Sequence, residues 1–145
     1  MNDLARAKEI LENEQFSFVL IKNGRVIKTS HKRGVIPLME VIRQDDRALD
    51  KAIIADKVIG RAAALLAVHY HVEAIYAELI SQKAREVLDD HSIFYQFAQC
   101  VPYIKNRELN DQCPLEKLTQ SISDPAKAYS QILKFYQEVL KITIS

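Results

Sequence analysis

The chain has 145 residues, and its 20 lysines and arginines against 19 aspartates and glutamates give a formal net charge of +1. Its 48% hydrophobic residues, three glycines and four prolines exclude a collagen-like protein, a disordered tail and a disulfide scaffold. One domain of this size buries roughly 70% of the surface of its unfolded chain, so it needs no metal or crosslink to fold. The near-neutral charge argues against nonspecific nucleic-acid or membrane binding as the main task.

The predicted location is the cytoplasm. The sequence contains no stretch near the ~20 uninterrupted apolar residues of a membrane span. Its first residues, Met1 to Leu4, lack the basic-then-apolar pattern of a secretory signal. Two cysteines, Cys100 and Cys113, suit a reducing compartment, although two cysteines alone do not exclude secretion.

The predicted elements begin with an amphipathic helix and a β-hairpin. Apolar residues recur on one face over Asp3–Glu14, which indicates a helix. Two runs rich in branched and aromatic residues, Phe16–Ile21 and Arg25–Thr29, then predict strands. Asn23-Gly24 stands between them, and both residues tolerate the positive φ of a tight hairpin turn.

After the hairpin, helices and strands alternate, and the whole chain is expected to form one domain. In chain order we predict a helix over Pro37–Gln44, a strand over Ala52–Ala55, a helix over Asp56–Val68, a strand over Glu73–Leu79, a helix over Gln82–Asp90, a strand over Ile93–Phe97, an extended segment over Val101–Ile104, a helix near Pro114 and another from Asp124-Pro125 to about Leu140. This order predicts a three-layer α/β/α sandwich with a mixed sheet.

Three separated blocks of the sequence carry a resemblance to a known family. They read NGRVIKTSHKRGVIPLMEVI, AIIADKVIGRAAALLAVHYHVEAIYAELIS and VPYIKNRELNDQCPLEKL. In this order they are similar to the family called domain of unknown function 1893, over about Phe16–Leu118. The C-terminal helix, Ala126–Leu140, lies outside that match. The resemblance implies a cytidine-deaminase-like fold, whose order of elements agrees with the predicted one, and it implies no established reaction.

The resemblance to deaminases does not extend to their zinc ligands. Zinc nucleobase deaminases use H-x-E and P-C-x-x-C, in which one histidine and two thiolates hold the metal that activates water. By order of elements, these motifs should begin the helix after the hairpin and the helix after the next strand. The first place reads IPLME over 36–40, without histidine, and the second reads ADKVIG over 55–60, without cysteine. We therefore expect no bound metal and no zinc-dependent deamination.

A histidine pair provides a second, weaker candidate for metal binding. His71-Val72-Glu73 spells H-x-E, and His69 precedes it by two residues. The motif falls at a predicted helix-to-strand junction, no P-C-x-x-C follows it, and no third ligand is evident. Histidines in a loop or at the end of a sheet are the favoured interpretation.

The first candidate binding site follows the predicted strand over Ala52–Ala55. Asp56 would begin a helix at the carboxyl edge of the sheet, where open α/β sheets bind ligands. The helix start would offer free N–H groups that suit a phosphate or a carboxylate, Lys57 and Arg61 would add positive charge, and Gly60 would permit close approach. The structural alternative is that Asp56 only caps the helix and the small residues only pack it.

The second candidate site lies near the predicted helix at Pro114. Asn106 and Arg107 precede it, and Arg107 could bind a phosphate bidentately or pair with a carboxylate. Cys113 would stand at a helix N-terminus, which can lower a thiol pKa, but neighbouring acidic residues would oppose thiolate formation. One of these acidic residues, Glu116, is itself a candidate ligand-binding residue, as are Asn106, Arg107 and Cys113. The alternative is a cap-and-turn motif.

Apolar residues form a stripe on the last predicted helix, and two interpretations of this stripe remain open. It can cover its own domain or bind a partner chain. Its members are Tyr129, Ile132, Leu133, Tyr136, Val139 and Leu140.

The leading hypothesis is a cytoplasmic, zinc-free binding domain without a cofactor, whose ligand is a nucleotide or a related phosphorylated small molecule. A second hypothesis is a metal-independent enzyme that uses Asp56, or Cys113, with Lys57, Arg61 or Arg107 as electrophilic support. The third is a protein–protein interaction module that uses the sheet edge and the C-terminal helix, and a homo-oligomer is compatible with all three.

Overall fold

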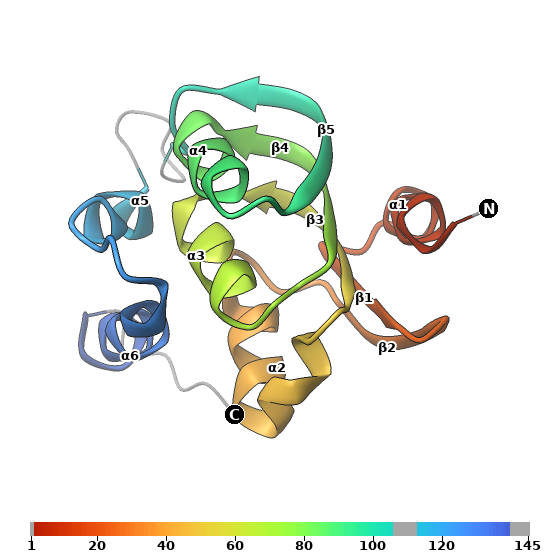
Figure 1. Ribbon diagram of the computed structural model, residues 1–145, viewed down its shortest axis with the longest axis horizontal. Helices are drawn as coiled ribbons and strands as arrows, with labels where there is room; N and C mark the ends of the chain where they lie inside the picture. The colour runs from red at the N-terminus through yellow and green to blue at the C-terminus, as the bar shows by residue number, and fades with distance from the viewer. Residues whose placement is uncertain (1, 106–112, 140–145) are drawn as a thin grey trace.

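The computed structural model describes residues 2–105 and 113–139 of the chain. Within them, the centre of the molecule is a five-stranded sheet formed by β1 (Phe18–Lys22), β2 (Arg25–Ser30), β3 (Ile53–Ile59), β4 (Ala74–Ser81) and β5 (Phe94–Val101). The strand order is β2-β1-β3-β4-β5 (Figure 1). β1 pairs antiparallel with β2 and β3, whereas β3, β4 and β5 are parallel, so the sheet is mixed.

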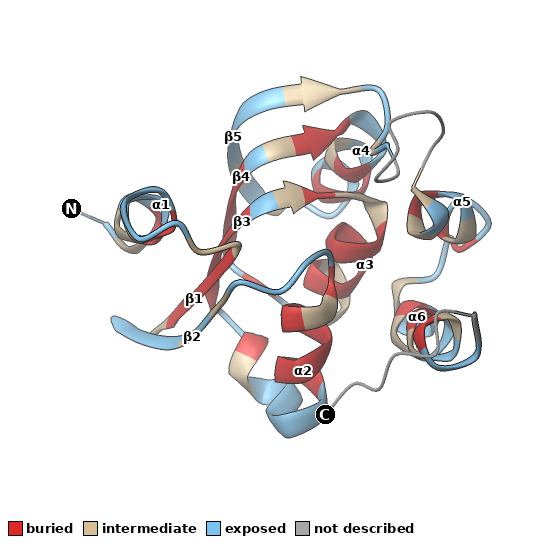
Figure 2. Cartoon of the chain, turned by 180° about the vertical axis from the view of Figure 1, so that it is seen from behind, coloured by how far each residue is buried: buried red, intermediate tan, exposed pale blue. Residues whose placement is uncertain are grey.

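Helices cover both faces of this sheet, which confirms the predicted α/β sandwich. One face carries α1 (Asp3–Asn13), and the other carries α2 (Ile36–Asp45), α3 (Arg61–His69) and α4 (Gln82–Asp90) (Figure 1). Two further helices, α5 (Pro114–Thr119) and α6 (Ala128–Lys134), lie on the outer side of α3 (Figures 1 and 2). Three short helical turns lie beside these helices: η1 (Asp46–Leu49) follows α2, η2 (Pro125–Lys127) precedes α6, and the π-helical η3 (Phe135–Val139) follows α6.

The predicted hairpin is confirmed. Lys22 of β1 pairs with Arg25 of β2 around a two-residue turn. In that turn, Asn23 has a φ of 52° and Gly24 a φ of 77°, the left-handed values that this residue pair tolerates. The turn therefore sets the register of the first two strands.

The boundary between β3 and α3 differs from the prediction. The sequence predicts a helix that begins at Asp56, but this residue lies inside β3, and α3 begins at Arg61. Asp56 pairs with Phe18 of β1 on one side and with Ala77 of β4 on the other. Because β1 and β4 pair with β3 on its two sides, the strand continues through the polar residues Asp56 and Lys57. The sequence around Asp56 does not show that these two neighbouring strands are there.

Two apolar cores lie on the two faces of the sheet. The smaller core packs α1 against residues of β1, β3 and β4, among them Val19, Ala55 and Tyr76. The larger core lies between the sheet and α2 to α4, and it includes Met39 and Leu65. No residue of β5 belongs to the core beneath α1 among the residues that the structure describes, so one face of β5 is uncovered (Figure 2).

The C-terminal helices cover their own domain, which decides between the two interpretations of their apolar stripe. Ile132 and Tyr136 are buried in the larger core, and Tyr129 and Leu133 pack against it. The side chain of Val139 and all of Leu140 fall outside the part of the chain that the structure describes.

The helices of the described residues are short or polar. None of them is long and apolar enough to cross a membrane.

Candidate functional site

A carboxylate from another helix occupies the amino end of α3. Glu116 belongs to α5, and its Oε1 accepts a hydrogen bond of 3.0 Å from the backbone amide of Arg61, the first residue of α3. The carboxyl group of Glu116 therefore occupies the position at the start of α3 where a helix would bind an anion.

Gly60, the N-cap residue of α3, allows the carboxyl group to come this close. A Cβ atom at this position would collide with Glu116 Oε1 and would lie 3.3 Å from both Glu116 Cδ and Ile104 Cγ1. The sequence analysis expects another group to approach the backbone closely at Gly60, and in the structure the group that does so is the carboxyl group of Glu116.

The second oxygen of this carboxyl group is left without a partner. Glu116 is only 2% exposed, and although the Ser81 hydroxyl lies nearby, no donor among residues 2–105 and 113–139 makes a hydrogen bond of good geometry to its Oε2. Burial raises the pKa of Glu116, and the Arg61 amide, the Ser81 hydroxyl and the Arg61 charge oppose this only in part. A buried acceptor without a donor costs free energy, so this oxygen marks a place where a donor belongs.

A small cavity lies at this carboxyl group. Its volume is about 50 Å³, and its walls come from three parts of the chain. The first part, before α2, contributes Gly34 and Val35. The end of β3 and the start of α3 contribute Val58, Gly60, Ala62 and Ala63. The third part, which leads into and includes the start of α5, contributes Ile104, Cys113, Leu115 and Glu116. Of these described residues, only Glu116 and Cys113 carry polar side-chain atoms.

A tyrosine from the C-terminal segment reaches the start of α2 beside the cavity. The Tyr136 hydroxyl would lie 3.3 Å from a Cβ on Gly34, whose φ of 60° already favours glycine. Burial raises the pKa of Tyr136 to about 12, with a further increase from Cys113 and an opposing hydrogen bond from the Val35 amide. The Tyr136 hydroxyl therefore lies at the amino end of α2, and Glu116 Oε1 lies at the amino end of α3.

The Arg61 side chain makes structural contacts, and its predicted role in binding stays a prediction. Its Nε donates to the carbonyl oxygen of Thr119 at 2.8 Å, and its Nη2 donates to that of Ile122 at 2.7 Å. Thr119 ends α5 and Ile122 follows it, so Arg61 links the start of α3 to the end of α5 and the segment after it.

Asp56 lies in β3 and does not line the cavity, which corrects its predicted position as a helix cap. It is buried, and its Oδ1 accepts a hydrogen bond of 3.1 Å from the Val58 amide. Burial raises its pKa well above the ordinary range, although the amides of Val58 and Lys57 oppose the shift. The Lys57 side chain is exposed. A role of either residue in binding is left as a prediction.

Cys113 caps α5, as predicted, and its side chain makes no capping hydrogen bond. It joins Gly60 and Glu116 in the cavity wall, so the structure brings these three predicted site residues together. Asn106 and Arg107 lie outside the described residues.

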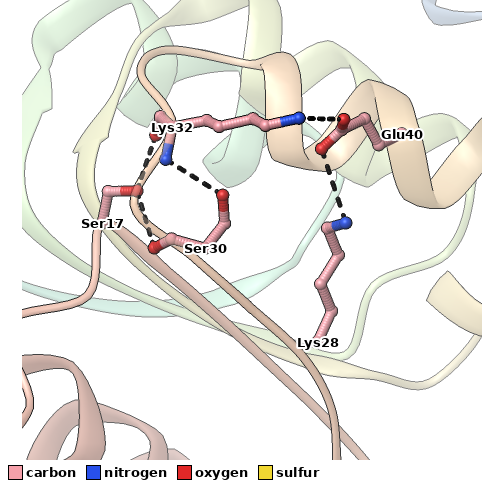
Figure 3. Close-up of polar contacts among 5 residues, drawn as sticks. All are labelled: Ser17, Lys28, Ser30, Lys32 and Glu40. Atoms are coloured by element: carbon pink, nitrogen blue, oxygen red, sulfur yellow. Dashed lines mark hydrogen bonds and ion pairs between the residues drawn. The ribbon is translucent and has the colours of Figure 1, made fainter. Parts of the chain in front are cut away.

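An ion-pair cluster that the sequence analysis did not predict holds the loop before α2. Glu40 Oε1 lies 3.4 Å from Lys28 Nζ, and Glu40 Oε2 lies 2.6 Å from Lys32 Nζ (Figure 3). The Ser17 hydroxyl is 2.9 Å from the carbonyl oxygen of Ser30 and 2.6 Å from that of Lys32. These contacts position the loop that contributes Gly34 and Val35 to the cavity.

The histidines do not form a metal site with other described residues. His69 packs edge-on against Tyr70 at 4.7 Å between ring centroids, and His71 is exposed with a φ of 62° in the turn after α3. Within the described ranges, no group of three or more His, Cys, Asp and Glu side chains is placed to hold a metal ion.

Comparison with known proteins identifies the family. The family model described as "Domain of unknown function (DUF1893)" matches residues 6–136. The chain belongs to the DUF1893 family. A crystal structure of a DUF1893 family protein from Thermotoga maritima is similar to it, with a TM-score of 0.83, 26% sequence identity, and coverage of 92% of this chain and 90% of that chain. No curated protein matches.

The DUF1893 match is wider than the expected Phe16–Leu118. It includes most of α1 and extends through α6 to Tyr136. The helices that supply Glu116 and Tyr136 to the site therefore belong to the family domain and are not an appendage to it.

Proposed function

We propose that this DUF1893 protein binds a nucleoside, a nucleotide or a related heterocyclic metabolite by an N–H group that donates to Glu116. One observation carries the proposal: Glu116 Oε2 is buried at a cavity and lacks a hydrogen-bond partner among the described residues. A carboxylate oxygen is an acceptor only, so the group that completes the site is a donor.

The geometry also constrains where a phosphate group would lie. The Arg61 amide at the start of α3 already donates to Glu116 Oε1, and the Arg61 guanidinium donates to backbone carbonyls. A phosphate would compete with the Glu116 carboxylate at this helix end. We therefore place the heterocycle toward Glu116 and any phosphate outside the cavity, which reverses the orientation expected from the sequence.

The size and the walls of the cavity suit the edge of a ring. At about 50 Å³ it is much smaller than the ~300–1,000 Å³ of typical small-molecule sites. An N–H-bearing edge can enter it while the remainder of the ligand lies over the exposed side at Gly34. The apolar side chains of Val35, Val58 and Leu115 offer contacts to such a ring.

We also propose that the fold is a zinc-free variant of the deaminase-like fold. Two observations support this proposal. The elements from α1 to β5 follow the order that the sequence resemblance implies. The cavity lies between the starts of α2 and α3, the two helices expected to carry the metal motifs, and the start of α3 reads Gly60-Arg61-Ala62-Ala63, without cysteine. The free thiols of Cys100 and Cys113 support the proposed cytoplasmic location.

The test is a binding screen with nucleobases, nucleosides and nucleotides, read by thermal shift and then by calorimetry. We expect at least one compound to bind, and Glu116→Gln to weaken that binding by about tenfold or more, because an amide N–H₂ replaces the acceptor. Glu78→Gln is the matched control, since Glu78 is exposed on β4. We expect this control to bind like the wild type.

Two outcomes would contradict the proposal. One is that no compound in the screen binds. The other is that Glu116→Gln and Glu78→Gln bind the hit with equal affinity, which would place the ligand elsewhere.

A further inference from the structure

β5 is an edge strand, and none of the described strands pairs with its outer edge. It pairs with β4 alone among the described strands, and most of its residues are exposed (Figure 2). Phe94, which lies beside Ala74 of β4, is 59% exposed. An open edge presents a row of unpaired backbone N–H and C=O groups to any strand that approaches.

The opposite edge of the sheet is protected, and β5 is not. β2 carries the charged residues Arg25 and Lys28, and its pairing with β1 is irregular between Leu20 and Ile21. Charged side chains and bulges are the usual means by which edge strands avoid pairing with another chain. The eight residues of β5, FYQFAQCV, include no charged residue and no proline.

Contacts from α4 hold β5 in place while its edge stays open. The Arg85 guanidinium lies 4.7 Å from the centre of the Phe97 ring. Its Nε donates to the Tyr95 hydroxyl at 3.2 Å, and its Nη1 lies 3.6 Å from Cys100 Sγ. A strand that is fixed before a partner arrives loses less conformational entropy on pairing.

We propose that β5 pairs antiparallel with β5 of a second copy of this chain, which joins the two sheets across a two-fold axis. The absence of charge argues for a second copy, because a strand without charged residues lies against itself without a like-charge pair. Gln96 and Gln99 supply side-chain donors and acceptors that are compatible with the same groups of the partner. The net charge of +1 adds little repulsion between copies.

Ala98 offers the most direct test, because it is exposed near the middle of β5 and therefore lies close to its own counterpart in an antiparallel pair. For the full-length wild type, we expect a dimer in sedimentation equilibrium and native mass spectrometry across the micromolar range. Ala98→Lys should raise the dimer dissociation constant by about tenfold or more. Mixing Ala98→Lys with Ala98→Glu chains should restore a mixed dimer.

Ile27→Lys provides the matched control on the protected edge, because Ile27 is 50% exposed on β2. We expect it to leave the dimer unchanged, and circular dichroism and thermal unfolding establish that each variant is folded. Gln96→Lys is a second β5 variant in case Ala98→Lys does not fold.

A wild type that stays monomeric over this range would overturn the proposal. A dimer that survives both β5 variants, or that Ile27→Lys abolishes, would overturn it as well. Binding of a different protein along β5 of a monomeric chain would identify the strand as a hetero-interface and would also reject the second copy.

Discussion

Glu40 and Glu116 are both nearly buried, at 5% and 2% exposure, but their surroundings shift their pKa values in opposite directions. Burial alone would raise the pKa of Glu40, but the hydrogen bond from Lys32 and the charges of Lys28 and Lys32 outweigh it and lower the pKa. Among the described residues no ion pair with Glu116 offsets its burial in this way, and the pKa of Glu116 is raised.

The difference between the two glutamates distinguishes a structural carboxylate from a candidate site. Each oxygen of Glu40 has a cationic partner, so nothing is left for a ligand to satisfy. Glu116 has one oxygen on the Arg61 amide and one without a partner in the described chain. A functional role is therefore argued from the unmet acceptor, and burial alone does not support it.

Among these substitutions, Gly60→Ala should lower the stability of the protein most, because the new Cβ would occupy the space of Glu116 Oε1. We expect a loss of about 2–3 kcal/mol of unfolding free energy, measured by urea denaturation. Gly24→Ala is the matched control: its φ of 77° disfavours alanine, but nothing lies within 4 Å of the new atom. That control should lose only about 1 kcal/mol.

A double variant sharpens this test. If the clash with Glu116 is the cause, Gly60→Ala combined with Glu116→Ala should be more stable than the sum of the two single losses predicts. Additive losses would mean that Gly60 matters for a reason other than the close approach of Glu116.

The same substitution at both glutamates should separate their roles. Glu40→Gln should lose about 1–2 kcal/mol at pH 7, because the charges of Lys28 and Lys32 lose their buried partner. Glu116→Gln should change stability by only about 0.5 kcal/mol, because Gln keeps an oxygen for the Arg61 amide. Glu86→Gln, at the exposed pair with Lys83, should lose less than about 0.5 kcal/mol.

The pH dependence of Glu40→Gln follows from the lowered pKa of Glu40. Its ion pairs stabilise the folded state fully above the ordinary glutamate pKa of 4.5, and this contribution is lost as the pH falls through the lowered pKa. The stability gap between wild type and Glu40→Gln should therefore narrow in acid. A constant gap from neutral to acidic pH would contradict the assignment.

Asp56→Asn should change stability in the opposite direction and should stabilise the folded protein. The folded state raises the pKa of Asp56 above its ordinary 3.8, so the folded chain holds the proton more tightly than the unfolded chain does. Stability is then lost as the pH rises through the raised pKa. Asn retains the acceptor for the Val58 amide and should stabilise the protein by about 1 kcal/mol at pH 8.

The measurement for Asp56 is the melting temperature of both proteins from pH 4 to pH 8. The advantage of Asp56→Asn should grow with pH and disappear in acid. A variant that is less stable than the wild type at pH 8 would show that the ionised carboxylate has a favourable partner.

Local signals in the sequence predicted the parts of the fold that depend on local chemistry. Asn23-Gly24 predicted the hairpin turn because the turn needs positive φ at both positions. The helix over Gln82–Asp90 has the bounds predicted for it, since Ser81 caps its first turn and apolar residues recur along one face. Asp56 misled the prediction because its strand partners come from β1 and β4.

Three of the candidate site residues lie together in the structure, but the contacts between them were not predicted. Gly60, Cys113 and Glu116 line one cavity. The sequence does not show that Glu116 contacts the start of α3, because Glu116 lies 55 residues after Arg61 in the chain. Tyr136 and Gly34 were not predicted as site residues. A signal for Gly34 was available, because a chain with only three glycines can hold them where the backbone needs a positive φ or a close approach, and Gly34 has a φ of 60°.

The contacts of Arg61 also have a consequence for the order of folding. Its amide and guanidinium bind groups 55, 58 and 61 residues further along the chain. Contacts so distant in sequence carry a large loop-closure entropy, so the segment from α5 onward is expected to dock after the sheet and α3 have formed. Amide hydrogen exchange at Arg61 would then report local opening of that segment while the central strands stay protected.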